Sequence, residues 1–279
     1  MTSIIFGILA ALVWGGSDFA GGLSSRQVGA VLAVFYADLI GLAALLVAIP
    51  FVRESSLSLG IILTSMGTGA IGSVGLIFLY HAMTIGQMSI AAPVAAMVGA
   101  VLPIVIGALT EGLPGLLQLA GFAFALAAVW LISQGNSAGR HHLERLADLR
   151  LPFLAGSCFG FYFILVHQVT QFATIWPMIM IRFGGMLFLL IILIIKRDKF
   201  SLRRTVWPFV TANGVLDVIG NLLYVLAGQT GRMDIAVVLS SLYPGGTVIL
   251  AWFFLEERLT KLQVIGITVA LIAIVLLTI

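Results

Sequence analysis

Ten long apolar segments, separated by short polar connectors, account for almost the whole chain. They cover roughly residues 4–23, 30–50, 58–83, 88–110, 116–134, 152–171, 176–195, 206–228, 233–254 and 262–279. A helix needs about 20 predominantly apolar residues to cross the hydrocarbon core of a bilayer. Each segment therefore predicts one transmembrane helix, and the sequence predicts an all-α integral membrane protein with ten spans.

The second half of the chain repeats the first at an offset of 145 positions. The matching pairs are residues 87–91 with 232–236, Glu111 with Glu256, Gln118 with Gln263, and Gly121 with Gly266. Each copy holds five segments, and an odd number of spans places the second copy upside down relative to the first. We therefore expect two inverted five-helix repeats around a central cavity, residues 1–135 and 152–279, joined by a loop over 136–151.

Composition supports a membrane protein and argues against other classes. With 61% apolar and 9% charged residues, a chain of 279 residues has too little polar surface for a soluble globule. The start Met1-Thr2-Ser3 carries no basic stretch, so a removable signal peptide is not expected. The single cysteine, Cys158, cannot form an internal disulfide. The net charge of +3 comes from bases in short loops, which favours topology signals over nucleic-acid binding.

These bases are divided unevenly between the two sets of connectors. Of 13 Lys and Arg residues in connectors, eleven follow odd-numbered segments and two, Arg53 and Arg232, follow even-numbered ones. Because cytoplasmic loops are enriched in Lys and Arg, the odd connectors are expected in the cytoplasm. This predicts a multi-pass protein of the plasma or inner membrane with both termini outside.

The eighth segment carries a stripe of polar and small residues on an otherwise apolar helix. Its members recur at helical spacing and are Asn213, Asp217, Gly220, Asn221, Tyr224 and Gly228. Asn, Asp and Tyr offer hydrogen-bond donors and acceptors to a substrate or to water, so the stripe predicts the lining of a cavity. Helix packing through small residues and interhelical hydrogen bonds is the alternative.

Two aspartates in the first two segments are candidates for proton coupling. Asp18 and Asp38 lie toward the same end of their helices, where they can approach each other or share Arg26. Mutual repulsion between close carboxylates favours proton uptake. A salt-bridged pair that stabilises the first hairpin is the alternative. His81 is a third candidate, for which a structural place at the membrane interface is the alternative.

Arg182 in the seventh segment is the one fixed positive charge inside a predicted span. A guanidinium matches carboxylate and phosphate geometry, so Arg182 either binds an anionic group of a substrate or permanently neutralises Asp217 or another carboxylate. We favour the internal ion pair. Aromatic residues such as Trp14, Tyr80 and Tyr243 supply walls suited to an organic substrate.

Three prolines predict irregular helices in the fourth and ninth segments, which are equivalent in the repeat. Pro93, Pro103 and Pro244 are expected to interrupt these segments and free backbone carbonyls toward a cavity. A packing kink without significance for transport is the alternative.

Several short patterns match those of a known family. They are Trp14-Gly15 in the first segment and, from the ninth to the tenth, Pro244, Ala251-Trp252, Glu257-Arg258-Leu259 and Gln263 with Gly266. By these residues the chain resembles the EamA-type, ten-helix branch of the drug/metabolite transporter superfamily. The resemblance implies a basket of ten helices around a central cavity, alternating access and transport of small metabolites. Many members of that family keep both termini in the cytoplasm, which is opposite to the orientation predicted here.

The expected function is secondary active transport of a small organic metabolite, an amino acid or related solute, by alternating access. Export and proton coupling are part of this expectation, and no cofactor or metal is. The substrate is expected to contact Asp217, Asn221, Tyr224, Asn213, Trp14, Tyr80, Tyr243 and Arg182. An intramembrane enzyme and a channel or scaffold are the alternatives, although the aspartates lack protease contexts and the histidines lack zinc spacing.

The two copies differ at the positions that carry the candidate chemistry. The positions equivalent to Asp18 and Asp38 in the second copy are Phe163 and Phe183, and those equivalent to Asp217 and Asn221 in the first copy are Gly72 and Leu76. Substrate and coupling roles are therefore expected where the second copy departs from the first.

Overall fold

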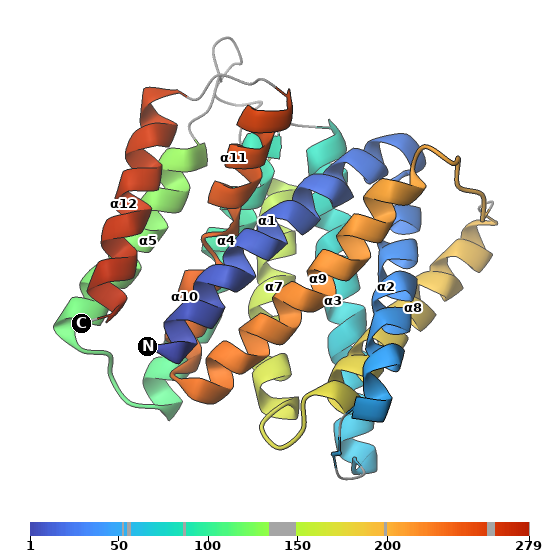
Figure 1. Ribbon diagram of the computed structural model, residues 1–279, viewed down its shortest axis with the longest axis horizontal. Coiled ribbons are helices and arrows are strands. Elements are labelled where there is room, and N and C mark those ends of the chain that lie inside the picture. The colour runs from blue at the N-terminus through green and yellow to red at the C-terminus, as the bar shows by residue number, and fades with distance from the viewer. Residues whose placement is uncertain are drawn as a thin grey trace.

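The computed structural model shows a bundle of long α-helices (Figure 1) and describes residues 1–51, 53–54, 57–85, 88–133, 149–197, 200–255 and 260–278. The helices are α1 (Thr2–Val28), α2 (Ala30–Ala48), α3 (Leu59–Ile85), α4 (Met88–Thr110), α5 (Leu116–Ser133), α7 (Arg150–Val169), α8 (Ile175–Lys196), α9 (Trp207–Thr230), α10 (Met233–Ser240), α11 (Tyr243–Leu255) and α12 (Lys261–Thr278). Most of the predicted 136–151 loop and the passage Glu257-Arg258-Leu259 lie outside the described residues.

The helices follow the predicted apolar segments. Within the described ranges, eight helical stretches are long and apolar enough to cross a membrane, and two apolar stretches, Leu116–Ile132 and Lys261–Leu277, are shorter. Large apolar side chains such as Leu12, Val105 and Ile191 are exposed on the outside of the bundle. In lipid, only helices and closed barrels satisfy all backbone polar groups internally, which is why such sequences fold into helices. The chain is thus a multi-pass membrane protein.

The fourth and ninth segments differ from the expected symmetric interruption. Helix α4 runs unbroken through Pro93 and Pro103, so the prediction of an interruption there is wrong. The ninth segment does break, because α10 ends at Ser240 and α11 begins at Tyr243. Pro244 has no N–H to donate to the Ser240 carbonyl, which removes one helical hydrogen bond at this break.

Both chain termini lie at one end of the bundle, and the C-terminal ends of α1, α8 and α11 lie at the other (Figure 1). Gly29 makes the tight turn between α1 and α2 with φ +84°, a conformation that favours glycine. Described bases at the end away from the termini include Arg26, Lys196, Arg203 and Arg204. Arg140, Arg145, Lys199 and Arg258 lie outside the described residues.

Two glutamates at the end that holds the termini bind the N-termini of second-half helices. Glu54 accepts hydrogen bonds from the backbone N–H groups of Thr174, Ile175 and Trp176 at 2.8–3.1 Å, at the start of α8. Glu111 accepts from the N–H of Met233 at 3.1 Å, at the start of α10. The first N–H groups of a helix have no intrahelical partner, and negative charge is favourable there. These contacts tie connectors of the first half to helices of the second.

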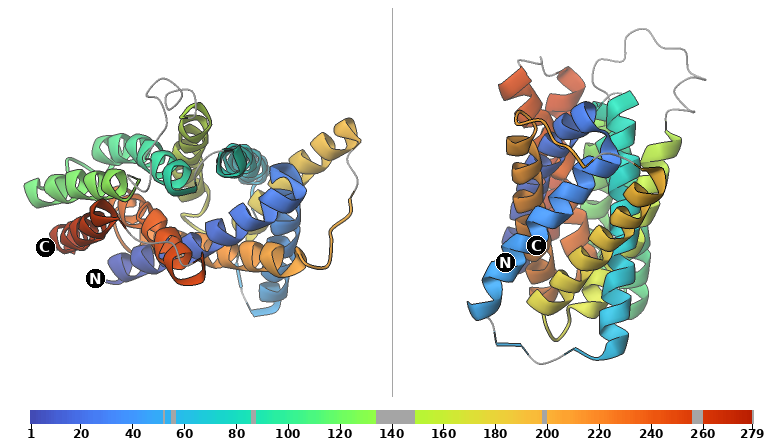
Figure 2. Two further views of the ribbon diagram at one scale, coloured as in Figure 1. Left: turned by 90° about the horizontal axis from the view of Figure 1, so that it is seen from above. Right: turned by 90° about the vertical axis from the view of Figure 1, so that its right-hand side faces the viewer.

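Helix packing is reciprocal between the two halves of the chain. Helix α1 packs on α9 as α7 packs on α3, and α1 packs on α10 and α11 as α7 packs on α4. Helix α2 packs on α9 as α8 packs on α3. Helices α5 and α12 pack on each other at one edge of the bundle (Figure 2).

Glycines at equivalent positions make equivalent close contacts. A Cβ at Gly121 would lie 2.8 Å from the side chain of Leu277, and a Cβ at Gly266 would lie 2.8 Å from Ile132. Both partners of these contacts are separated by the same 145 positions that relate the sequence halves. Gly69 and Gly214 form another such pair. Gly69 meets the Ile181 carbonyl of α8, and Gly214 lies against the Ala37 carbonyl of α2.

We expect Gly69→Ala to destabilise the protein, because a Cβ there would overlap the Ile181 carbonyl oxygen and force α3 away from α8. Overpacking of this kind costs about 1–3 kcal/mol. Gly67→Ala on the same helix is the matched control, since a Cβ there meets nothing within 4 Å. Thermal unfolding in detergent should show a lower Tm for Gly69→Ala and an equal or higher Tm for Gly67→Ala. Equal Tm values for Gly69→Ala and the wild type would contradict the close α3–α8 contact.

Candidate functional site

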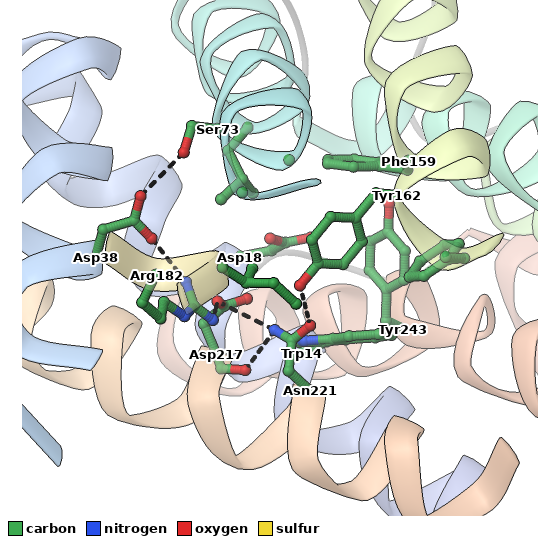
Figure 3. A pocket seen from close by; sticks show the side chains of 15 residues that line it. Trp14, Asp18, Asp38, Ser73, Phe159, Tyr162, Arg182, Asp217, Asn221 and Tyr243 are labelled. Carbon is green, nitrogen blue, oxygen red and sulfur yellow. Dashed lines mark hydrogen bonds and ion pairs between the residues drawn. The ribbon is translucent and has the colours of Figure 1, made fainter. Parts of the chain in front are cut away.

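A cavity of about 60 Å³ lies between the helices of the two halves (Figure 3). Helices α1, α2 and α3 from the first half and α7, α8, α9 and α11 from the second contribute side chains to its lining. Of the residues predicted to bind substrate, five line it: Trp14, Arg182, Asp217, Asn221 and Tyr243. Two of the predicted proton-coupling residues, Asp18 and Asp38, line it as well.

Arg182 forms ion pairs with two carboxylates on different helices. Its Nη1 donates to Asp38 Oδ1 at 2.7 Å, and its Nη2 donates to Asp217 Oδ2 (Figure 3). The arginine is 5% exposed and Asp38 is 3% exposed. Ser73 on α3 donates to the second oxygen of Asp38 at 3.0 Å. The network therefore joins α2, α3, α8 and α9 around one buried guanidinium.

The expectation that Asp38 shares Arg26 with Asp18 is wrong. Arg26 is exposed at the end of α1, and Asp38 pairs with Arg182 across the interface between α2 and α8. Proximity to the hairpin end suggested Arg26, but the packing of second-half helices against α2 brings a closer cation.

Asp18 is the cavity carboxylate that has no ion-pair partner among the described residues. It is 7% exposed and forms no salt bridge with any of the described residues. Its Oδ1 accepts a long hydrogen bond of 3.4 Å from the Tyr80 hydroxyl. Tyr80 also donates toward Asn213 Oδ1 at 3.1 Å, and Ser17 donates to the same oxygen at 2.9 Å. A single hydroxyl hydrogen cannot fully serve both acceptors, which leaves the Asp18 carboxylate weakly satisfied.

Asn221 extends the polar lining from Asp217 toward the aromatic side of the cavity. Its Nδ2 donates to the Asp217 carbonyl at 2.7 Å and lies 3.2 Å from Asp217 Oδ2. Its Oδ1 accepts from the Tyr162 hydroxyl at 2.6 Å (Figure 3). The helical spacing of Asp217 and Asn221 thus places both on the cavity face of α9, as the stripe predicted.

Three other residues predicted to contact substrate lie behind the lining. Tyr80 and Asn213 are buried and hold Asp18 and Ser17 through the hydrogen bonds just described. Tyr224 is 1% exposed, donates to the Phe163 carbonyl at 3.1 Å and packs against Trp14 with ring centroids 5.9 Å apart. These residues lie behind the lining residues and hold them in place by hydrogen bonds and ring packing. His81, the remaining proton-coupling candidate, is exposed on α3 and is not among the lining residues.

Helix α7 contributes an aromatic part of the lining, in which Tyr162 was expected among the aromatic walls and Phe159 and Phe163 were missed by sequence reasoning. Phe159, Tyr162 and Phe163 all face the cavity. The repeat offset contained the signal, because Phe159 is equivalent to Trp14 and Phe163 to Asp18. Likewise, Gly72 and Leu76 of α3, the equivalents of Asp217 and Asn221, line the cavity. Among the described residues, no group of three or more His, Cys, Asp or Glu side chains is arranged to hold a metal ion.

Comparison with known proteins gives the family. The model of the EamA-like transporter family matches residues 149–279. An uncharacterized protein of Methanocaldococcus jannaschii is 36% identical over 129 residues, which are 46% of this chain and 94% of that protein. A protein crystal structure superposes with a TM-score of 0.80 at 15% identity and covers 99% of this chain and 96% of its own. That structure supports the fold alone.

Residues 149–279 thus belong to the EamA-like transporter family of the drug/metabolite transporter superfamily. This family consists of membrane transporters and not of enzymes. The family thus agrees with the resemblance seen in the sequence, and it places a small-molecule substrate and a lipid bilayer among the partners of this chain.

We expect Arg182→Met to destabilise the protein strongly, because Asp38 and Asp217 would lose their shared cation. Removing one member of a buried ion pair costs about 3–5 kcal/mol. The triple variant Arg182→Met, Asp38→Asn, Asp217→Asn should recover much of that loss, since no uncompensated charge remains. Arg203→Met, on an exposed connector, is the matched control. Thermal unfolding in detergent measures all three, and a wild-type Tm for Arg182→Met would contradict the network.

Proposed function

We propose that the protein is a secondary active transporter that moves a small organic metabolite by alternating access through the cavity between its two halves. The observation that carries this proposal is the placement of buried charged and aromatic side chains from both halves around one cavity. Charges at membrane depth are expensive and mark pathways for substrates or ions. Binding sites of secondary transporters lie near the bilayer midplane between structural repeats.

Two inverted repeats are part of the proposal, and two independent observations support them. Exchanging the halves maps the contacts of α1 with α9, α10 and α11 and of α2 with α9 onto those of α7 with α3 and α4 and of α8 with α3, and it maps the pair α5 and α12 onto itself. The archaeal relative also matches, over nearly its whole length, a stretch of only 129 residues of this chain. A half of about that size is expected to hold one five-helix unit.

In the described conformation the cavity is too small for an organic metabolite. A volume of about 60 Å³ holds a few water molecules, whereas sites for organic ligands measure roughly 300 Å³ or more. At the end that holds the termini, Glu54 and Glu111 keep first-half connectors on α8 and α10. Admission of a metabolite from that end is therefore expected to require the release of these contacts as the halves move apart.

The proposal assigns proton coupling to Asp18. Asp38 and Asp217 are both held in ion pairs with Arg182. Asp18 has no such partner among the described residues and lines the same cavity. It is therefore the carboxylate best placed to exchange a proton during the transport cycle.

Flux in proteoliposomes tests the transport function and its coupling. A panel of radiolabelled amino acids and amines should include at least one solute whose uptake saturates and accelerates when the same unlabelled solute is preloaded. An imposed pH gradient should change that flux in the wild type but not in Asp18→Asn. Equal wild-type flux with and without the gradient would remove the coupling, and the absence of exchange for every solute would contradict the transport of these classes.

Cysteine labelling tests the orientation, with both termini proposed outside. In a Cys158→Ala background, Phe172→Cys places a thiol at a 90% exposed site near the termini, and Arg203→Cys places one in an exposed basic connector at the other end. A membrane-impermeant maleimide added to intact cells should label position 172 and spare position 203. The reverse pattern would place the termini in the cytoplasm.

A further inference from the structure

We propose that the transported solute is an organic cation that binds between Asp18 and the aromatic side chains around it. The inference rests on the transport function proposed above and names the chemical class of its substrate. It depends on four features of the cavity: its charge balance, the state of Arg182, the free oxygen of Asp18 and the aromatic walls.

The cavity holds more acidic than basic groups. Three carboxylates, those of Asp18, Asp38 and Asp217, line it together with one guanidinium, that of Arg182. Protonation of one carboxylate still leaves an excess negative charge. At membrane depth this charge is screened weakly, so a positively charged ligand is attracted and an anionic ligand is repelled.

The guanidinium is not available to a substrate carboxylate. Arg182 Nη1 is bound to Asp38 and Nη2 to Asp217, while Nε is fully buried and without a hydrogen-bond partner. An anionic or zwitterionic ligand would have to displace one of these aspartates to reach the arginine. The displaced carboxylate would then be left buried without a cation, which is strongly unfavourable.

Asp18, by contrast, presents an unused acceptor. Its Oδ1 has the 3.4 Å contact with Tyr80, and its Oδ2 accepts no hydrogen bond from the described residues. The residue is more than nine-tenths buried and lines the cavity. Buried polar atoms are nearly always hydrogen-bonded, and an ammonium donor satisfies a carboxylate with a strong charge-assisted bond.

The aromatic walls suit the remainder of a cationic ligand. Trp14 lies one helical turn before Asp18 on α1, and its ring stacks at 5.6 Å from Phe163, which occupies the position equivalent to Asp18 in the second half. Tyr162, Phe159 and Tyr243 complete the wall (Figure 3). Ring faces attract ammonium and guanidinium groups, most strongly where water is excluded. One acid opposite several rings is therefore a site for an organic cation.

A series of ligands matched in shape and differing in charge tests the inference on purified, full-length protein. Phenethylamine, phenethyl alcohol, phenylacetate and phenylalanine share one aromatic group, and choline and agmatine add two further cations. A ligand that binds the folded state raises its Tm. We expect the three cations to raise the Tm and the neutral, anionic and zwitterionic compounds to leave it unchanged.

Variants then locate the effect. Asp18→Asn should weaken phenethylamine binding on the order of tenfold or more, measured by radioligand binding. Trp207→Leu, which removes a half-exposed ring outside the cavity, should leave it unchanged. Trp14→Leu, which removes a ring face and keeps the carboxylate, should also weaken binding and serves if Asp18→Asn does not fold.

Three results would overturn the inference. They are stabilisation by phenylacetate or phenethyl alcohol as large as that by phenethylamine, undiminished amine binding in both cavity variants, and no stabilisation by any of the cations. Failure of the transport function gives a different pattern. Flux of amino acids or anions without amine binding would support the proposed transport function and contradict a cationic substrate. Amine binding without flux of any solute would support a cation site and contradict the transport function.

Discussion

The buried ion network of Arg182 is the interaction on which the arrangement around the cavity depends. A guanidinium at membrane depth is tolerated only when its charge is compensated, and here two aspartates on different helices supply the compensation. Because the partners come from α2 and α9, and Ser73 of α3 holds Asp38, four helices are fixed in mutual register. The network also determines which carboxylate is left over, and that carboxylate is Asp18.

Equivalent positions of the two sequence copies line this cavity with different side chains. Trp14 and Phe159, Asp18 and Phe163, Gly72 and Asp217, and Leu76 and Asn221 are equivalent pairs whose members all line it. The repeat therefore supplies the position of the lining twice, whereas in three of these pairs only one member carries a carboxylate or an amide. Such a cavity has an acidic and an aromatic face although the backbones around it are related.

The helices were predictable because lipid allows the chain few alternatives. An apolar run of sufficient length must satisfy its backbone hydrogen bonds internally, and within the described residues eight helical stretches are long and apolar enough to cross a membrane, with two shorter apolar ones beside them. The broken ninth segment was anticipated from Pro244, but the same argument was wrong for Pro93 and Pro103. A proline removes one hydrogen bond, and surrounding helices decide whether the helix ends there.

The cavity was predictable in part. Helical spacing placed Asp217 and Asn221 on one face, and that face does line the cavity. Spacing does not tell how far a side chain reaches or what covers it, so Tyr80, Asn213 and Tyr224 were expected at the surface of the cavity and lie one layer behind it. The partner of Asp38 was also beyond local reasoning, because Arg182 is 144 positions away in the chain.

The contact between α5 and α12 is self-complementary. Leu277 packs against Gly121, and Ile132 packs against Gly266, so the two helices contribute equivalent residues to the contact. A surface of this kind is what a two-fold symmetric dimer uses, since each protomer contributes the same residues. Two separate half-length chains could therefore join through it in antiparallel orientation, and fusing them end to end would leave the contact unchanged. The last helices of the two halves thus hold each other through a contact of the kind that joins two protomers.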